Sequence, residues 1–241
     1  MKAFFDLLTY PLRLLFVILI TILDSSGGLL GMIFFPKFYF KLNHYRSWAK
    51  RLLFFAGIKV VSVGVERLEP KASYVFVANH SSYLDIPALF VAIPNNLRIM
   101  YKRELEKIPF FGWFLKKSDF IAIEREEIAS ARGSLNKALE LIQQDVSVLI
   151  FPEGTRSLDG SLREFKKGAL YLAVRSGKPI VPVAISGTNK LLPRGGLLIR
   201  TGQVKVTIGE PLKLSTTGGK AEIERITKTL HDKIYEMLIQ S

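Results

Sequence analysis

The sequence predicts an α/β fold: a mixed or largely parallel sheet of about seven strands, covered by helices on both faces, with an N-terminal membrane-interacting helical hairpin. Two observations carry the α/β class. Short apolar runs alternate with helical patterns from about residue 58 onwards, and 241 residues suit one α/β domain with a segment appended. The hairpin rests on the apolar sequence before residue 36. We therefore expect a membrane-associated helical segment at 1–57 and an α/β domain at 58–241.

The N-terminal segment contains two apolar runs, at 14–23 and 29–35, separated by the polar stretch DSSGG at 24–28. Each run is shorter than the roughly 20 apolar residues that cross a bilayer, and a joined helix would place Asp24 and two glycines at its centre. We therefore expect a helix–turn–helix that enters one leaflet. A cleaved signal peptide is the alternative, but no A-x-A-like site follows the first run, and Asp6 stands where positive charge is expected.

A basic amphipathic helix is expected after Pro36. When the sequence is wound as a helix, its apolar side chains fall within one narrow arc and its basic side chains lie outside that arc. Two compatible interpretations stay open: the apolar face packs on the core of the domain, and the basic flank contacts lipid head groups. The apolar set is Phe38, Leu42, Tyr45, Ala49, Leu52 and Ala56, and the basic set is Lys37, Lys41, His44, Lys50 and Arg51.

The remaining sequence alternates strand-like runs with helical patterns. Apolar strands of this kind are buried on both faces, and the loops at their carboxyl ends carry the chemistry of such sheets. Polar residues directly after a strand are therefore candidate site residues. We expect strands at 60–65, 74–78, 97–101, 120–123, 146–151, 180–185 and 204–208, and helices at 130–144, 164–175 and 221–239.

Composition narrows the classes of partner. The chain has 34 basic and 21 acidic side chains, and a net charge of +13 favours nucleic acid, an anionic membrane or phosphorylated small molecules. The absence of cysteine excludes disulfides and thiolate nucleophiles. The sequence contains no nucleic-acid-binding motif, G-x-S-x-G pentapeptide or P-loop, and its three histidines are scattered. Nucleic-acid binding, serine hydrolysis and zinc chemistry are therefore disfavoured.

The first polar cluster, Asn79 and His80, ends the strand at 74–78, and Asp85 follows five residues after the histidine. Ser82 and Asp85 match a helix-capping pattern, which is the purely structural interpretation. Pro87 favours a helix that starts at Asp85, because an earlier start would place the proline where it removes an intrahelical bond. A turn before the helix would let Asp85 accept the Nδ1 proton of His80 and leave Nε2 free as a base. On these residues alone both interpretations stay open.

The second polar cluster is FPEGTRS at 151–157, after the strand at 146–151. Arg156 suits bidentate recognition of a phosphate, and Gly154 allows the backbone to approach a ligand closely. The alternative is a solvated turn in which Glu153 and Arg156 pair only with each other. Both clusters are expected at the same edge of the sheet.

Four sequence blocks, in this order, resemble the glycerolipid acyltransferases, and among them the bacterial 1-acyl-sn-glycerol-3-phosphate (lysophosphatidic acid) acyltransferases. The first block is NHSSYLD at 79–85, which matches N-H-x4-D. The second is KRELEKIPFFGWFLKKSDFIAIER at 102–125, which resembles K-x-E-L-x-x-x-P-x-x-G followed by a strand that ends in an acid and an arginine. The third is FPEGTRS, which matches in full, and the fourth is VPVAIS at 181–186. The second block departs from the pattern in two places: a frequent glycine is replaced at Ser118 or Asp119, and Glu124 stands for aspartate.

The resemblance implies an acyltransferase that moves an acyl group from a thioester to the sn-2 hydroxyl of 1-acyl-glycerol 3-phosphate and forms phosphatidic acid. His80 is then the general base, oriented by Asp85, and transfer is direct rather than through an acyl-enzyme on Ser81 or Ser82. The implied phosphate ligands are Arg125 and Arg156, to which the charge pattern adds Lys102. The residues expected to shape the site are Asn79, Glu153, Gly154 and Thr155.

No cofactor or metal is expected beyond the acyl donor, which is acyl-CoA or acyl carrier protein. The expected partners are the lysophospholipid, this donor and an anionic membrane surface, without nucleic acid, and the expected location is the cytoplasmic face of the inner membrane. The aromatic segment IPFFGWF at 108–114 lines an acyl-chain path, inserts into lipid or belongs to the core. Two alternatives remain: an acyltransferase acting on another acceptor, such as glycerol 3-phosphate, and a non-enzymatic lipid-binding protein.

Overall fold

The sheet of the computed structural model agrees with the predicted strand positions. The structure describes residues 2–35, 44–123, 128–144, 146–166, 169–213 and 219–240, and within them the sheet has seven strands in the order β1-β7-β6-β2-β5-β3-β4. Described neighbours are parallel except β6 and β7, which are antiparallel, so the predicted mixed sheet is confirmed. The strands are β1 (Ile58–Val63), β2 (Val75–Ala78), β3 (Leu97–Lys102), β4 (Ile121–Ile123), β5 (Ser147–Ile150), β6 (Ile180–Ser186) and β7 (Gly202–Ile208).

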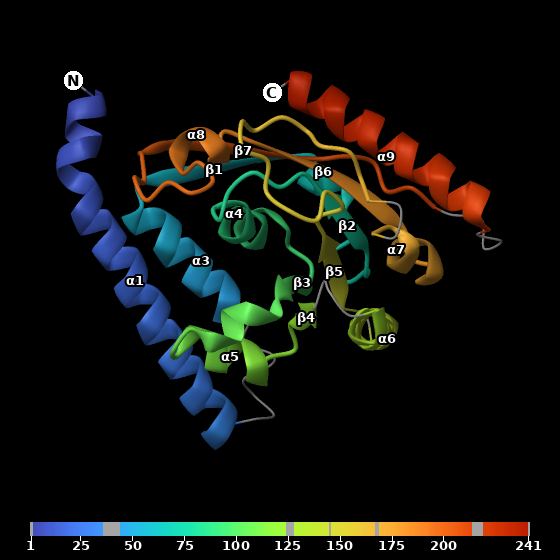
Figure 1. Cartoon of the computed structure of the whole chain (residues 1–241), viewed down its shortest axis with the longest axis horizontal. Coiled ribbons are helices and arrows are strands. Elements are labelled where there is room, and N and C mark those ends of the chain that lie inside the picture. Colours follow the sequence, from blue (N-terminus) through green and yellow to red (C-terminus); the bar gives the residue numbers. More distant parts are fainter. Residues whose placement is uncertain are drawn as a thin grey trace.

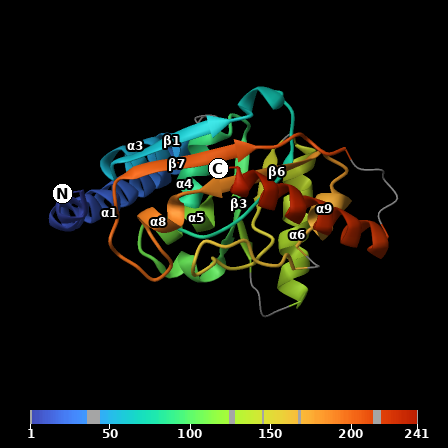
Figure 2. The ribbon, with the colours of Figure 1, turned by 90° about the horizontal axis from the view of Figure 1, so that it is seen from above.

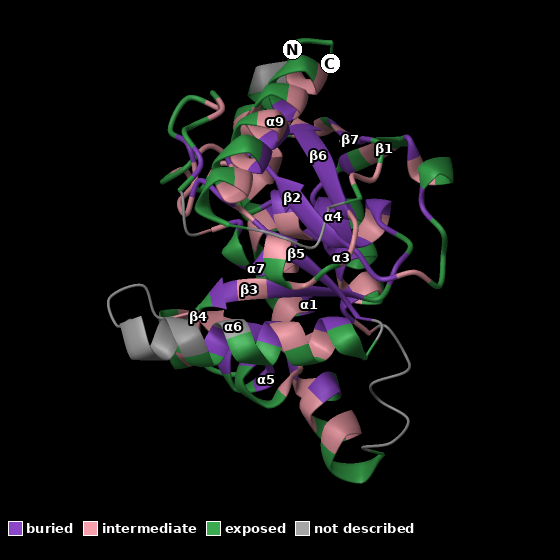
Figure 3. Ribbon diagram, turned by 90° about the vertical axis from the view of Figure 1, so that its right-hand side faces the viewer, coloured by how far each residue is buried: buried purple, intermediate pink, exposed green. Residues whose placement is uncertain are grey.

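The central strand β2 shows why the strands appear in the sequence as unbroken apolar runs. Successive side chains of a strand point to opposite faces of the sheet. Phe76 and Ala78 lie in the hydrophobic core on one face, and Val75 and Val77 lie in the core on the other. Both faces of the sheet are therefore covered, and Figure 3 shows the buried residues concentrated in its strands.

Helices cover the sheet on both sides (Figures 1 and 2). On one side, α3 (His44–Phe55) and α4 (Asp85–Ala92) contact β1. On the other side, α6 (Ile128–Gln143) contacts β4 and β5, and α9 (Lys220–Ile239) contacts β6. The connections contain the short elements η1 (Val65–Arg67), η2 (Arg103–Lys107), α5 (Phe111–Lys117), α7 (Tyr171–Arg175) and α8 (Thr188–Leu191).

One predicted helix is shorter than expected. The helical pattern at 164–175 yields only α7, which begins at Tyr171. Before it, the amide of Arg163 donates to the side chain of Glu153 and the amide of Lys166 donates to the carbonyl of Pro152. These backbone groups are held by the FPEGTRS segment, which keeps the chain extended there.

The predicted N-terminal hairpin is wrong, because the segment forms one continuous helix, α1 (Lys2–Phe34). We expected a turn at 24–28, since an unpaired acid and two glycines are unfavourable in an apolar helix. In the structure α3 pairs that acid: Arg51 donates from Nε and Nη2 to the carboxylate of Asp24, and the His44 ring lies 2.9 Å from the Asp24 carbonyl oxygen. A tertiary contact thus removes the penalty on which the expected turn depended.

Helix α1 has the length and composition of a helix that could cross a membrane. Within Phe4–Phe34, its most apolar window of 18 residues has a mean hydropathy of 2.0, and 17% of that window is buried. It also packs on α3 and α5, along one side of the molecule (Figure 1). The predicted amphipathic helix is confirmed from His44 onwards, with Tyr45, Ala49 and Leu52 buried, whereas Phe38 and Leu42 lie outside the described residues.

Candidate active site

The two polar clusters meet at one edge of the sheet, as predicted. Strands β2 and β5 are parallel neighbours, with Val77 opposite Ile150, so their carboxyl ends lie together. His80 follows β2, and FPEGTRS follows β5. The amide of Ser157 donates to the carbonyl of His80 at 2.8 Å, which joins the end of one cluster to the start of the other.

His80 and Asp85 contact each other in the turn before α4. The Nδ1 atom of His80 lies 2.8 Å from Oδ2 of Asp85, and the amides of Ser81 and Ser82 donate to the same oxygen at 2.8 and 2.9 Å. Helix α4 begins at Asp85, as the position of Pro87 predicts. Because the carboxylate is fully buried and accepts from Nδ1, the proton-accepting position left on the ring is Nε2.

The imidazole of His80 is also held from one face by Phe151. The two rings are stacked, with their centroids 4.0 Å apart and their planes 17° from parallel. The sequence analysis did not assign Phe151 a role. Its place between an apolar strand and a polar loop was the available signal, since a residue there reaches the same edge as His80. Stacking and the carboxylate together fix the orientation of the ring.

Glu153 holds the backbone of the site and not the side chain of Arg156. Its Oε1 accepts from the amide of His80 at 2.6 Å, and its Oε2 accepts from the amide of Arg163 at 3.2 Å. The alternative of a Glu153–Arg156 pair is therefore wrong. Burial raises the pKa of Glu153 to about 7, although the two amide hydrogen bonds act in the opposite direction. The carboxyl group joins the two clusters through their backbones.

Gly154 makes room for a side chain of the same protein. The residue has a φ of 70°, and a Cβ placed on it would lie 2.8 Å from Cε of Lys166. The space that we expected a ligand to use is thus occupied by the stem of Lys166. The sequence analysis did not predict this contact, because the two residues are separated by an irregular loop.

Arg156 lies over the aromatic ring of Tyr83. Its guanidinium carbon is 3.6 Å from the ring centroid, and Arg194 donates to its carbonyl at 2.8 Å. A guanidinium stacked on a ring keeps its edge free for hydrogen bonds. Since Tyr83 belongs to the turn between His80 and Asp85, Arg156 places a positive charge beside that turn.

The other predicted site residues have separate positions. Asn79 exchanges hydrogen bonds with the backbone of Ile185 at 2.9 and 2.7 Å and so joins β2 to β6. Thr155 is half-buried in the same loop as Arg156. Lys102 is exposed and pairs with Glu104 at 2.8 Å, with no described contact to His80. Arg125 lies outside the described residues.

An apolar pocket of about 620 Å³ lies beside the turn. Tyr83 and Leu84 of the turn belong to its wall. Three residues of the segment IPFFGWF, Ile108, Phe111 and Phe114, line the pocket. Phe110 and Trp113 do not line it and are exposed, as is Ile108 at the rim. The other walls come from α1, α3, α4, β3 and the segment 192–199. Among the described residues, no group of three or more histidine or carboxylate side chains is placed to hold a metal ion.

Comparison with known proteins defines the class of this α/β chain. It belongs to the acyltransferase family, whose model matches residues 59–186. It is 32% identical over 196 residues to the chloroplastic 1-acyl-sn-glycerol-3-phosphate acyltransferase of Brassica napus (80% of this chain, 55% of that protein). The 1-acyl-sn-glycerol-3-phosphate acyltransferase of Saccharomyces cerevisiae is 34% identical, over 81% of this chain and 67% of that protein. The enzyme of the same name from Borreliella burgdorferi is 31% identical, over 80% of this chain and 77% of that protein.

A solved structure is similar over the whole chain. The crystal structure of the 1-acyl-sn-glycerophosphate (LPA) acyltransferase, PlsC, from Thermotoga maritima matches with a TM-score of 0.83 and 28% sequence identity, over 100% of this chain and 97% of that one. The chain spans about half the length of the plant relatives, 55% for Brassica napus and 53% for Arabidopsis thaliana. The α/β architecture and the family resemblance of the four sequence blocks are confirmed.

Proposed function

We propose that this chain transfers an acyl group from a thioester to the sn-2 hydroxyl of 1-acyl-glycerol 3-phosphate and so forms phosphatidic acid. The observation that carries the proposal is a histidine whose Nδ1 is held by a buried carboxylate, in a turn that also forms part of the wall of an apolar pocket. The printed names of the relatives agree with this activity. A lipid-binding protein would need the pocket but not the oriented base.

In this mechanism the free Nε2 of His80 takes the proton of the substrate hydroxyl. The oxygen attacks the thioester carbonyl, a C–O bond forms, the C–S bond breaks, and the imidazolium returns its proton to the leaving thiolate. Asp85 stabilises the imidazolium that forms between the two proton transfers. No cofactor is required, and the donor is acyl-CoA or acyl carrier protein.

Direct transfer is supported by the two serines of the turn. The Oγ of Ser81 lies 3.1 Å from the hydroxyl of Thr188, and the Oγ of Ser82 donates to the carbonyl of Leu192 at 2.7 Å. Both serines are buried and held away from the His80 ring nitrogens by these bonds. A nucleophilic serine would instead have to contact the base.

The phosphate and the acyl chain of the substrate each have a matching group near His80: Arg156 for the phosphate and the apolar pocket for the chain. Arg156 offers a guanidinium to the phosphate. The apolar pocket, at about 620 Å³, lies within the usual range of roughly 300–1,000 Å³ for small-molecule sites and would house an acyl chain. In this arrangement Arg156 and the pocket flank the hydroxyl that is acylated.

We propose that α1 lies in the cytoplasmic leaflet of the inner membrane without crossing it. Its exposed face is apolar over most of its length. Polar contacts hold it on the domain at two places along its length: Arg13 donates to the carbonyl of Ile199 at 2.9 Å, and Asp24 accepts from Arg51. A helix held at both places cannot cross the bilayer without carrying the charged domain into it.

The proposed function predicts a strong preference among acceptors. Purified protein in lipid vesicles, supplied with labelled acyl-CoA or acyl carrier protein, should convert lysophosphatidic acid to phosphatidic acid with a kcat/KM about 10- to 100-fold above that for lysophosphatidylcholine, because the choline group screens the phosphate from Arg156. Faster acylation of glycerol 3-phosphate would favour the alternative acceptor. Tight lipid binding without any transfer would favour the lipid-binding protein.

Replacement of Arg156 by alanine should raise KM for lysophosphatidic acid by about 10-fold or more, with a smaller effect on kcat, because a charged hydrogen bond to the phosphate is lost. Steady-state kinetics with the acceptor varied would measure this change. Arg200→Ala is the matched control, since Arg200 is exposed and the one hydrogen bond of its side chain within the described residues goes to the Lys190 carbonyl, at 3.4 Å. An unchanged KM in Arg156→Ala would count against the phosphate role.

A further inference from the structure

The segment 108–113, here called the aromatic turn, has an inner and an outer face. Ile108 and Phe111 line the apolar pocket. Phe110 and Trp113 are not part of the pocket lining: they are 39% and 52% exposed, and their ring centroids are 5.2 Å apart, while Ile108 lines the pocket and is itself 44% exposed. Two large aromatic side chains therefore form an exposed pair directly outside the pocket wall.

The backbone of the aromatic turn is strained at one member of this pair. Phe110 has a φ of 61° and a ψ of −62°, a conformation that residues with a side chain rarely adopt. The turn is closed by bonds from the amide of Phe111 to Pro109 and from the amide of Gly112 to Ile108, both at 2.7 Å. Gly112 is buried against the backbone of residues 105 and 106, where a Cβ has no space. A conformation kept against such strain points to a use for the exposed rings.

Positive charge surrounds the exposed pair. Residues 102–117 carry five basic and two acidic side chains, a net charge of +3. All five basic side chains are exposed. The two acidic side chains have partners within the protein: Glu104 pairs with Lys102, and Glu106 accepts a hydrogen bond from the Tyr101 hydroxyl. Exposed aromatics surrounded by lysines are typical of segments that contact anionic lipid. The basic residues are Lys102, Arg103, Lys107, Lys116 and Lys117.

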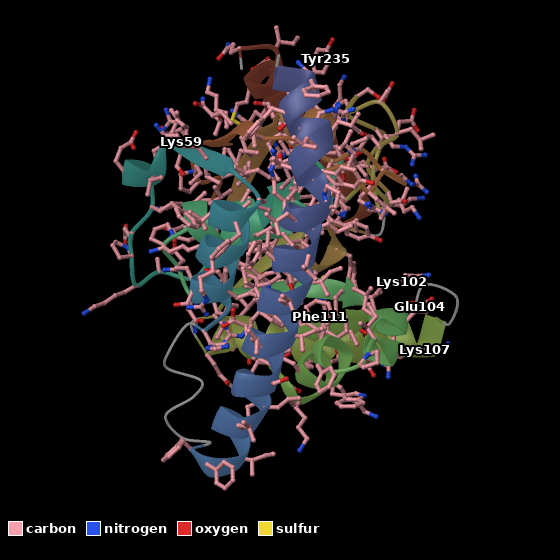
Figure 4. The ribbon with its side chains drawn as sticks, turned by 90° about the vertical axis from the view of Figure 1, so that its left-hand side faces the viewer. Lys59, Lys102, Glu104, Lys107, Phe111 and Tyr235 are labelled. Carbon is pink, nitrogen blue, oxygen red and sulfur yellow. The ribbon has the colours of Figure 1, made fainter. Side chains whose placement is uncertain are left out.

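The aromatic turn lies beside the apolar face of α1. Helix α5, which begins at Phe111, contacts α1. Figure 4 shows Phe111 beside α1, with Lys102 and Lys107 on the outer flank of the same region. The C-terminal end of α1 projects past α5 (Figures 1 and 4). It carries exposed Ile33 and Phe34, and exposed Phe35 follows directly after it. One flat membrane surface can therefore meet both elements.

We propose that the aromatic turn is a second membrane contact: Phe110 and Trp113 insert into the interfacial layer of an anionic phospholipid bilayer, and the surrounding lysines meet its phosphate groups. The wall of the apolar pocket at Ile108 and Phe111 then faces the lipid, so an acyl chain enters from the bilayer. This last step rests on the proposed function, whereas the contact itself is independent of catalysis.

The chain provides its own fluorescent reporter. It has two tryptophans, so Trp48→Phe leaves Trp113 as the sole one. We expect Trp113 emission to shift to shorter wavelength on vesicles containing phosphatidylglycerol, and to be quenched by lipids brominated on their acyl chains, with a weaker effect on pure phosphatidylcholine. If acrylamide quenches Trp113 equally with and without vesicles while the protein is fully vesicle-bound, the contact is wrong.

A pair of variants provides a second test. The double variant Phe110→Ser/Trp113→Ser should lower partitioning onto phosphatidylglycerol vesicles about 10-fold, because the two aromatic rings no longer bury apolar surface in the bilayer interface. Tyr235→Ser, which removes an exposed aromatic on α9 at the far end of the same view (Figure 4), should not change partitioning. The double variant should still acylate a water-soluble short-chain lysophosphatidic acid at the wild-type rate. Unchanged partitioning of the double variant would overturn the contact, and absence of acylation in the wild type would instead overturn the proposed function.

Discussion

His80→Ala is expected to abolish nearly all acyl transfer, with kcat falling by about 10²–10⁴-fold, the usual contribution of a positioned general base. The reason is geometric. The Nδ1 of His80 is held by Asp85 and its ring face by Phe151, so Nε2 is presented to the substrate in one orientation. An alanine leaves the hydroxyl with only water to accept its proton. Transfer of labelled acyl groups to lysophosphatidic acid would measure the loss.

The same variant should still fold and bind membranes. The His80 backbone accepts from Ser157 and donates to Glu153, and both bonds remain when the ring is removed. Thermal unfolding and vesicle sedimentation should therefore stay close to wild type. His231→Ala is the matched control, because His231 lies on α9 against Phe165 and outside the described contacts of the site. Equal transfer by His80→Ala and wild type would rule out the proposed base.

The sequence predicted the fold and the meeting of the two clusters because both depend on local patterns. Buried strands appear as apolar β-branched runs whatever their neighbours are, and the carboxyl ends of parallel strands meet at one edge. Pro87 marked the start of α4, which in turn allowed the contact between His80 and Asp85. The order of the strands has no comparable local signal, since it is set by which surfaces pack together.

The errors arose where a distant residue changes a local preference. Asp24 argues for a turn only while it is unpaired, and its partner Arg51 comes 27 positions later on another helix. A pair between Glu153 and Arg156 was considered because both are charged, whereas the actual partners of Glu153 are main-chain amides, which leave no trace in a sequence. The stem of Lys166 over Gly154 was not foreseen because an irregular loop separates the two residues.

Glu153→Ala should lower both stability and activity. The change removes the acceptor of two amides, those of His80 and Arg163. A buried donor without a partner costs about 1–3 kcal/mol, and the loss here falls mainly on the His80 amide, because Arg163 is exposed and water can reach it. Because one of these amides belongs to the residue that carries the base, we expect kcat to fall as well, by about 10-fold or more for a displacement of the ring. Thermal unfolding in detergent and the transfer assay would measure the two losses. Wild-type values of both would contradict the backbone role of Glu153.

Glu153→Gln separates the charge of this group from its shape. Burial raises the pKa of Glu153 from its ordinary value of 4.5 to about 7, so between these values the folded protein holds a proton that the unfolded chain has released. The wild-type free energy of unfolding should therefore carry a favourable term that is complete below pH 4.5 and declines as the pH rises to about 7. Glutamine does not titrate. Its side-chain NH2 group would face the backbone amide of His80 or of Arg163, and two donors cannot form a hydrogen bond. The stability difference between wild type and Glu153→Gln should thus shrink from pH 5 through pH 7 and level off only above it, when unfolding of both is measured to either side of this range. A difference that stays constant or grows with pH would show that the carboxyl group is already charged in the folded protein at acidic pH.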